Sequence, residues 1–192
     1  MLLPDFMIEE HVLTGALGID PFDPLCIQPA SYDVHLGKHA IRPLKHTDPI
    51  RIRDLIYVGL GGSIPIKAVG AEAEAAWLGS MLYLPPHTFI LGELQEHIRI
   101  PPGLAAKIEG KSSVGRGGVT VHVTAGWVDP GWDGVLTLEL CNLSKNTLIL
   151  DVGQKIAQIS FYMMAAPAKR PYGHESLGSH YQGDTKVQGA KA

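Results

Sequence analysis

Cysteine is scarce in this 192-residue chain: only Cys26 and Cys141 occur, far apart in the sequence. Neither belongs to a CxxC pair, so the ligand spacing of a common structural zinc site is missing. No run of about 18 apolar residues is present to form a membrane-spanning helix. The N-terminus does not combine a basic start with an apolar stretch, which argues against a signal peptide. We therefore expect a soluble, cytoplasmic protein with reduced thiols and no membrane partner.

Charge is also sparse. Charged residues make up 18% of the chain, the formal net charge is -3 and the isoelectric point is near 6.3. A chain without a basic excess is a poor partner for a nucleic acid polymer. Hydrophobic residues make up 45%, which is typical of a globular domain and argues against disorder. A small anionic ligand, held by a few well-placed cations, is compatible with this balance.

Glycine and proline are plentiful, with 22 and 14 residues, and they punctuate the chain from residue 19 onward. Between them lie short runs of strand length, rich in β-branched residues and bounded by turn residues. The clearest runs are SYDVHLG, SMLYLPP, TFILGEL, HIRIPPG, VTVHVTAG, GVLTLELCN, NTLILDVGQ and KIAQISFYM. Many short strands at this spacing predict an all-β sandwich or barrel.

Two segments depart from the strand pattern. Residues 5–17 are predicted to form a helix, with Asp5 as its cap and with Ile8, Val12 and Leu13 on one face. Gly15, near its C-terminal end, and Gly18, just after it, would end the helix. Residues 66–80 are compatible with a second short helix, although their glycines disfavour it.

The last part of the chain is different in composition. From about residue 167 it is rich in polar, charged and glycine residues, which is typical of a flexible extension. Tyr172 and Tyr181 nevertheless predict that part of it packs against the domain. No internal repeat or interdomain linker is apparent. We expect one domain over residues 1–192, with a C-terminal arm at about 167–192.

The segment GKSSVGRGG, residues 110–118, has the composition of a phosphate-binding turn. Ser112 and Ser113 supply hydroxyls, and Arg116 can bind a phosphate through two parallel hydrogen bonds. The spacing is not that of a Walker loop. The alternative is an ordinary turn, because serine and glycine are common turn residues.

Two carboxylates between residues 122 and 142, Asp129 and Glu139, are candidate site residues. Strand alternation puts Leu136, Leu138 and Leu140 on one face, and Val135, Thr137, Glu139 and Cys141 on the other. If Glu139 is buried, its pKa rises toward the range of a general base. The alternative is a solvated charge. Asp129 precedes Pro-Gly, and aspartate is also a very common ordinary turn residue at such a position. Only the combination of these groups in one span favours a site.

Together these stretches resemble the trimeric dCTP deaminases of the dUTPase-like superfamily. The matching stretches are IQPASYDVHLG (27–37), GKSSVGR (110–116), VHVTAGWVDPGW (121–132), LTLEL (136–140), GQKIAQISF (153–161) and RPYG with GSHYQG (170–183). They run in the family's order over most of the chain and are weakest at about 38–80. The resemblance implies an all-β fold with a short N-terminal helix. The expected architecture is a distorted jelly-roll or β-clip barrel, assembled as a homotrimer with active sites between subunits.

The resemblance also implies catalytic roles. Glu139 matches the glutamate that moves protons during deamination of cytosine. Ser112 and Arg116 match residues that hold the triphosphate and the attacking water. Ala125 matches a residue whose backbone carbonyl positions that water, and Asp129 matches an aspartate near the sugar.

Further positions match nucleotide-contacting residues of the family. The phosphate turn would hold the triphosphate, the strand backbone at 137–138 would read the pyrimidine edge, and the arm would close on the ligand. The implied binding residues are Lys111, Ser113, Val114, Gly115, Trp127, Thr137, Leu138, Gln158, Tyr172, His180 and Asp184. At two of them this chain departs from the pattern, because the family usually has lysine where His180 stands and glutamine where Asp184 stands.

No metal is implied at the base. Zinc-dependent deaminases carry H-x-E and P-C-x-x-C motifs, and this chain has neither. The resemblance implies Mg²⁺ bound through the phosphates of the substrate, with no protein side chain as ligand.

The family divides at the turn after Ala125. Deaminases that stop at dUTP carry a His-Arg pair there, whereas this chain has Gly126 and Trp127. That contrast favours the type that converts dCTP to dUMP, ammonia and pyrophosphate and supplies dUMP for thymidylate synthesis. In that type Asp129 would orient a second water toward phosphorus. The alternatives are a deaminase that yields dUTP, a pure dUTPase, and a non-catalytic barrel that senses nucleotides.

Overall fold

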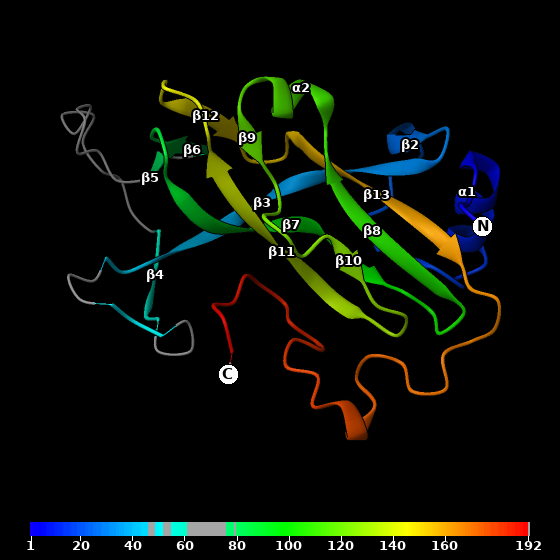
Figure 1. The fold of residues 1–192 in the computed structure, drawn as a ribbon. Helices are drawn as coiled ribbons and strands as arrows, with labels where there is room; N and C mark the ends of the chain where they lie inside the picture. The colour runs from blue at the N-terminus through cyan, green and yellow to red at the C-terminus, as the bar shows by residue number, and fades with distance from the viewer. Residues whose placement is uncertain (46–48, 52–54, 61–75, 79, 192) are drawn as a thin grey trace.

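The computed structural model describes residues 1–45, 49–51, 55–60, 76–78 and 80–191. Strands dominate this part of the chain (Figure 1). The long strands are β3 (Ser31–Pro43), β7 (Phe89–Arg99), β8 (Leu104–Gly110), β11 (Asp133–Asn142) and β13 (Lys155–Met163). The shorter ones are β1 (Gly18–Asp20), β2 (Ile27–Gln28), β4 (Tyr57–Gly59), β5 (Ala76–Leu78), β6 (Met81–Leu84), β9 (Val119–Thr120), β10 (Trp127–Val128) and β12 (Leu148–Asp151). The helices are α1 (Asp5–Leu13) and α2 (Ser112–Arg116), with 3-10 turns at Pro24–Cys26 and Glu175–Leu177.

One large sheet curls on itself. Its strand order is β10-β8-β13-β3-β7-β11-β9, with β1 added on β7 and with β2 and β4 added on β3. The first part of β3 pairs with β13 and the later part with β7, so this strand joins the two halves. Register shifts interrupt the ladders within β3, β11 and β13, and such bulges bend strands. A separate three-stranded sheet, β12-β6-β5, lies beside it. The expected all-β fold is confirmed.

The curled sheet encloses an apolar core. Alternate residues of its central strands point inward and are buried, as the strand period requires. They include Tyr32, Val34 and Leu36 of β3, Ile90, Leu94 and Ile98 of β7, Leu138 and Leu140 of β11, and Ile159 and Phe161 of β13. Burying one such side chain contributes about 1.5–3 kcal/mol, so these strands supply much of the stability of the fold.

The N-terminal helix is shorter than predicted and is capped differently. It begins at Asp5, with Pro4 in the N-cap position and no side-chain cap, and it ends at Leu13. Ile8 is buried and Val12 packs on the core, but Leu13 is 74% exposed, so two of the three residues predicted on the apolar face contact the core. Gly15 adopts a φ of 74° and ends the helix before residue 17.

The sequence of residues 66–80 was compatible with a short helix. The described residues of this segment, 76–78 and 80, form no helix. Residues 76–78 form β5 and pair with β6, because the apolar run there completes the small sheet. Residues 66–75 and 79 lie outside the described part of the chain.

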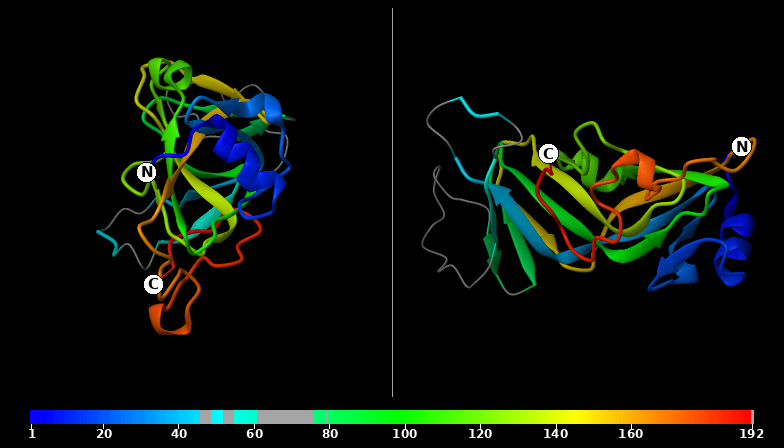
Figure 2. Two further views of the ribbon diagram at one scale, coloured as in Figure 1. Left: turned by 90° about the vertical axis from the view of Figure 1, so that its right-hand side faces the viewer. Right: turned by 90° about the horizontal axis from the view of Figure 1, so that it is seen from below.

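The C-terminal arm packs against the barrel after β13, as the tyrosines predicted. Its backbone bonds to the loop that follows β7 (Ala168 N to Pro102 O, 2.9 Å) and to the turn before β11 (Tyr172 N to Pro130 O, 2.7 Å). Tyr172 and Tyr181 both pack on the core. Figure 2 shows the arm running along one side of the barrel toward the C-terminus.

A glycine makes room for this arm. Gly131 has a φ of 91°, and a Cβ there would lie 2.6 Å from Pro171 Cβ and 2.8 Å from Tyr172 O. These distances are too short for a real contact, so a side chain at 131 would push the arm away. The turn before β11 therefore requires glycine for two reasons, its backbone conformation and the approach of the arm.

Gly131→Ala should loosen the arm. The matched control is Gly178→Ala, because Gly178 also has a positive φ (59°) but no described atom within 4 Å of its Cβ position. Both variants carry the backbone strain, about 1–3 kcal/mol. Only Gly131→Ala should speed trypsin cleavage after Lys169, measured by limited proteolysis; Arg170 is followed by proline and is not a trypsin site. Equal cleavage rates in the two variants would contradict the idea that Gly131 makes room for the arm.

Candidate active site

The predicted phosphate turn is a single helical turn, α2, where a loop was expected. Within it Arg116 Nε donates a hydrogen bond to Ser112 Oγ at 3.2 Å, and both side chains are exposed. Ser113 and Gly115 are exposed as well, while Val114 packs on the core and holds the turn down. The turn therefore presents hydroxyls and a guanidinium side by side to solvent, an arrangement that suits phosphate oxygens.

Lys111 anchors this turn. Its ammonium lies 2.5 Å from Oδ1 of Asp33 on β3, and Asp33 is only 2% exposed. Lys155 approaches the other oxygen of the same carboxylate at 3.4 Å. A buried carboxylate needs such partners. The positive charge of Lys111 is thus engaged by Asp33 at the base of α2.

Glu139 is half-buried and held against a loop. Its Oε2 accepts hydrogen bonds from the backbone N–H groups of Val123 (2.6 Å) and Thr124 (3.4 Å). Leu138 and Leu140, its neighbours on β11, point into the core, as the alternation predicted. The structure therefore brings Glu139 to the loop that carries Ala125. A carboxylate has about four acceptor sites, so these two bonds leave room for a water or a substrate group.

His122 lies at the start of that loop. Its Nε2 faces Glu109 at 3.3 Å, and the hydrogen bond from Lys107 lowers the pKa of Glu109 although burial opposes this. Its Nδ1 is buried without a hydrogen-bond partner among the described residues. Two histidines of β3 are also paired with carboxylates, His35 with Glu96 and His39 with Glu93.

The outer edge of β11 is open at Thr137. On this edge the arm bonds Val135 N, and the loop after β9 bonds Glu139 N through Val121 O. In an antiparallel strand every second residue points its N–H and C=O to the same edge, so those of Thr137 face outward too. No backbone partner reaches them within the part of the chain that the structure describes. The opening could accept the hydrogen-bonding edge of a planar base.

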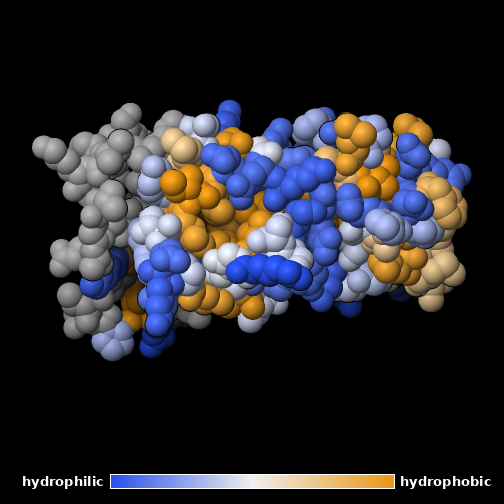
Figure 3. All heavy atoms as spheres, turned by 90° about the horizontal axis from the view of Figure 1, so that it is seen from above, coloured by the Kyte–Doolittle hydropathy of each residue, from blue (hydrophilic) through white to orange (hydrophobic). Residues whose placement is uncertain are grey.

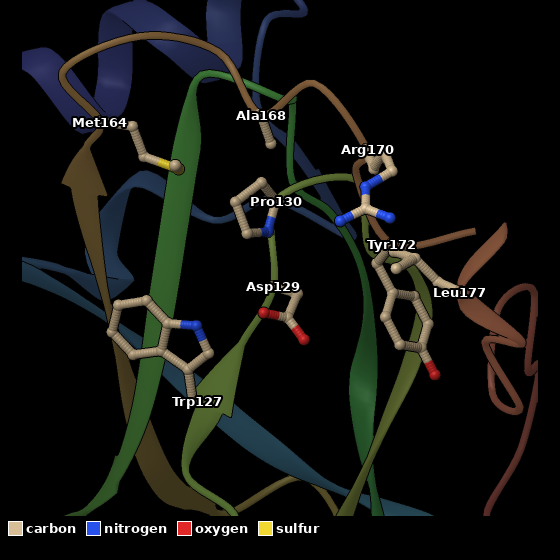
Figure 4. A pocket seen from close by; sticks show the side chains of 8 residues that line it. All are labelled: Trp127, Asp129, Pro130, Met164, Ala168, Arg170, Tyr172 and Leu177. Atoms are coloured by element: carbon tan, nitrogen blue, oxygen red, sulfur yellow. The ribbon is translucent and has the colours of Figure 1, made fainter. Parts of the chain in front are cut away.

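A surface pocket of about 330 Å³ lies where the turn before β11 meets the arm (Figure 4). Its lining residues are Trp127, Asp129, Pro130, Met164, Ala168, Arg170, Tyr172 and Leu177. Three of these were predicted from the sequence as site residues: Trp127, Asp129 and Tyr172. Trp127 is 57% exposed, whereas Trp132 is buried and packs on the ring of Tyr172, with 5.5 Å between ring centroids. Arg170 was not predicted as a site residue, although it begins the RPYG stretch that carries part of the resemblance.

Near the end of the arm, Lys191 forms an ion pair with Asp184. Lys191 Nζ lies 3.0 Å from a carboxylate oxygen of Asp184, donates to the backbone carbonyl of His180 (2.9 Å), and stands 5.0 Å from the ring centre of Tyr181. Asp184 is therefore neutralised by a lysine seven residues away. Gln158 lies on β13, opposite Asp33 of β3.

The predicted residues do not all meet in one chain. Figure 1 and the left view of Figure 2 place α2 on one side of the barrel and the arm on the opposite side. Ser112 and Arg116 thus belong to a different surface from the pocket that contains Asp129 and Tyr172.

Neither a metal centre nor a membrane span is found where the structure describes the chain. Among the described residues no three His, Cys, Asp or Glu side chains are arranged to hold a metal ion. None of the described helices is both long and apolar enough to cross a bilayer.

Comparison with known proteins identifies the family. A model of the dCTP deaminase-like family matches residues 2–164. The dCTP deaminase, dUMP-forming, of Corynebacterium efficiens is 40% identical over 183 residues, which cover 95% of this chain and 90% of that protein. The protein of the same name from Acidothermus cellulolyticus is 39% identical over 188 residues, with 95% and 91% covered.

A solved structure supports the fold. The 2'-deoxycytidine 5'-triphosphate deaminase from Agrobacterium tumefaciens has a TM-score of 0.59 and 21% sequence identity. The alignment covers 84% of this chain and 47% of that one, so this chain spans about half of its length. The sequence and the fold agree, and the chain belongs to the dCTP deaminase-like family.

Proposed function

We propose that the protein converts dCTP and water to dUMP, ammonia and pyrophosphate. The observation that carries this function is the identity of 37–40% with relatives named dCTP deaminase, dUMP-forming, over at least 95% of the chain. The site geometry supports it, because one carboxylate is held beside a loop and a second lies in a pocket. A deaminase that stops at dUTP, a pure dUTPase and a sensor are not favoured by these relatives.

Deamination would depend on Glu139. A water attacks C4 of cytosine, Glu139 takes a proton from it, and the protons pass to N3 and to the departing ammonia. The carbonyl of Ala125 would accept a hydrogen bond from the water and orient it. General acid–base catalysis of this kind contributes about 10²–10⁴-fold, so positioning must supply the rest.

The base would be read at the opening of β11. The outward N–H and C=O of Thr137 present one donor and one acceptor, which can pair with the edge of a pyrimidine. Leu138 is buried beneath them and fixes the strand. Glu139 follows on the same outer edge, so a base bound there lies close to the carboxylate that acts on it.

The triphosphate would be held by Ser112 and Arg116 and neutralised by Mg²⁺, a hard cation that prefers phosphate oxygens and water. Asp129 would orient a second water for attack at the α-phosphorus, with Trp127 and Tyr172 flanking the nucleotide. No protein side chain is needed as a direct metal ligand in this proposal.

Complete sites would form in a homotrimer. Because α2 and the pocket lie on opposite sides of one chain, a neighbouring subunit is needed to bring them together. Seen from the side of α2, apolar residues flank a hydrophilic strip across the surface (Figure 3). Val123, Leu143 and Ile149 are large apolar residues that the single chain leaves exposed, which suits a subunit contact. Each subunit would be a single domain, and its arm, about 167–192, would close on the bound nucleotide. The trimer would act in the cytoplasm.

Glu139→Gln should release ammonia about 10²–10⁴-fold more slowly from dCTP, because the amide cannot accept the proton. Its carbonyl oxygen can still accept the Val123 N–H, so the fold and nucleotide binding should persist. A coupled ammonia assay and calorimetric titration with dCTP measure the two quantities. Glu175→Gln, an exposed glutamate in the arm, is the control. Ammonia release at the wild-type rate would exclude Glu139 as the base.

Asp129→Asn should separate the two reactions. Wild-type protein given dCTP and Mg²⁺ should release ammonia and yield dUMP without accumulated dUTP. The variant should still release ammonia but accumulate dUTP, measured by chromatography of the nucleotides. The control is Asp133→Asn, since Asp133 lies near the same turn but faces His97 at 3.2 Å. If wild-type protein gives dUTP alone, or if the variant still makes dUMP, the assignment of Asp129 is wrong.

Mixed trimers should test the shared site. Arg116→Ala and Glu139→Gln should each be inactive alone. Co-expressed with different tags, they should recover roughly a quarter of the wild-type ammonia release, because random assembly pairs an intact Arg116 with an intact Glu139 at that fraction of the interfaces. A mixture no more active than either variant would mean that both residues act within one subunit.

A further inference from the structure

The pocket between the arm and the turn before β11 contains one carboxylate and one guanidinium. These belong to Asp129 and Arg170, and the rings of Trp127 and Tyr172 flank them. Figure 4 shows the guanidinium of Arg170 directed into the pocket, on the side of Pro130 and Asp129. The structure gives neither charged group an ion pair or a side-chain hydrogen bond with any described residue. Both are thus free to bind a ligand.

The backbone holds Arg170 in this place. Two residues before it, Ala168 N bonds Pro102 O at 2.9 Å, and two residues after it, Tyr172 N bonds Pro130 O at 2.7 Å. The segment is therefore fixed on both sides, and the absence of a side chain at Gly131 lets it lie flat on the turn. Only the side chain of Arg170 has to move to meet a ligand.

The chemistry of the pocket suits one phosphate of a nucleotide. Its volume of about 330 Å³ lies at the lower end of small-molecule sites, which span roughly 300–1,000 Å³. A carboxylate alone would repel a phosphate. A guanidinium offsets that repulsion and binds phosphate oxygens through two parallel hydrogen bonds.

We propose that Arg170 is a catalytic residue for the cleavage of the triphosphate, acting on the phosphate next to Asp129. This inference rests on the proposed function and deepens it. A water oxygen forms a bond to the α-phosphorus while Asp129 takes its proton. The bond from that phosphorus to the bridging oxygen breaks, and pyrophosphate leaves with the electron pair. Arg170 binds the oxygens on which negative charge accumulates.

The role of Arg170 differs from that of Arg116. Arg116 lies on α2, on the other side of the barrel, and would hold the phosphates from a neighbouring subunit in both reactions. Arg170 lies beside the carboxylate of only one reaction, the hydrolysis at phosphorus. Its loss should therefore affect pyrophosphate release far more than ammonia release.

Arg170→Gln tests the proposal, with Lys169→Gln as the matched control. Lys169 is the adjacent exposed cation and does not line the pocket. With saturating dCTP and Mg²⁺, Arg170→Gln should slow pyrophosphate release about 10- to 100-fold, the effect of losing hydrogen bonds to a charged group. Ammonia release should fall less than about threefold, so dUTP should accumulate. Arg170→Lys should recover part of the pyrophosphate rate, and Lys169→Gln should match wild type.

Two results would overturn the inference. One is pyrophosphate release from Arg170→Gln at the rate of Lys169→Gln. The other is a parallel fall of ammonia and pyrophosphate release, which would indicate a general structural role; thermal unfolding of each variant shows whether the fold is retained. Failure of the proposed function would instead appear in the wild-type protein, as absence of both products.

Discussion

The site depends on the incomplete pairing of β11. This strand has one long neighbour, β7, and its other edge is covered only in parts. At one end the arm bonds Val135, and at the other the loop after β9 bonds Glu139. Between them the outward N–H and C=O of Thr137 have no backbone partner among the residues that the structure describes. An unpaired strand edge usually attracts another chain, but a gap of one residue between two covered parts is too short for a strand and long enough for a base.

Those two coverings also position the carboxylates. The loop that covers β11 at Glu139 donates its N–H groups to that side chain, so pairing and orientation arise from the same contact. The arm that covers the other end of β11 also closes the pocket around Asp129. Removing either covering would therefore change both the edge of the strand and one of the two acids. This coupling explains how a mostly β domain holds several polar groups in fixed places at its surface.

The sequence predicted the local features well. Alternation placed Leu138 and Leu140 on one face of the strand and Glu139 on the other, and Pro-Gly at 130–131 marked a turn, because these follow from the two-residue period and from backbone conformation. Contacts between distant positions could not be read in this way. Lys111 meets Asp33 across 78 residues, and Arg170 reaches the pocket of Asp129 only because the arm folds back. The predicted end of α1 was wrong because Gly15 adopts a positive φ, which ends the helix before residue 17.

The charges of the arm also depend on a contact that the sequence alone does not show. His180 and Asp184 depart from the family pattern in a way that, from the sequence, weakens the attraction for a triphosphate. In the folded arm Lys191 pairs with Asp184 and bonds the carbonyl of His180, so the local sum of charge is close to neutral. This pairing leaves Lys191 and Asp184 without net charge to offer a phosphate, so the attraction falls to Arg116 on one side of the barrel and to Arg170, near the start of the arm, on the other. If a trimer brings those two guanidinium groups to the same nucleotide, binding needs the assembled protein, and a single chain with net charge -3 would hold its substrate weakly.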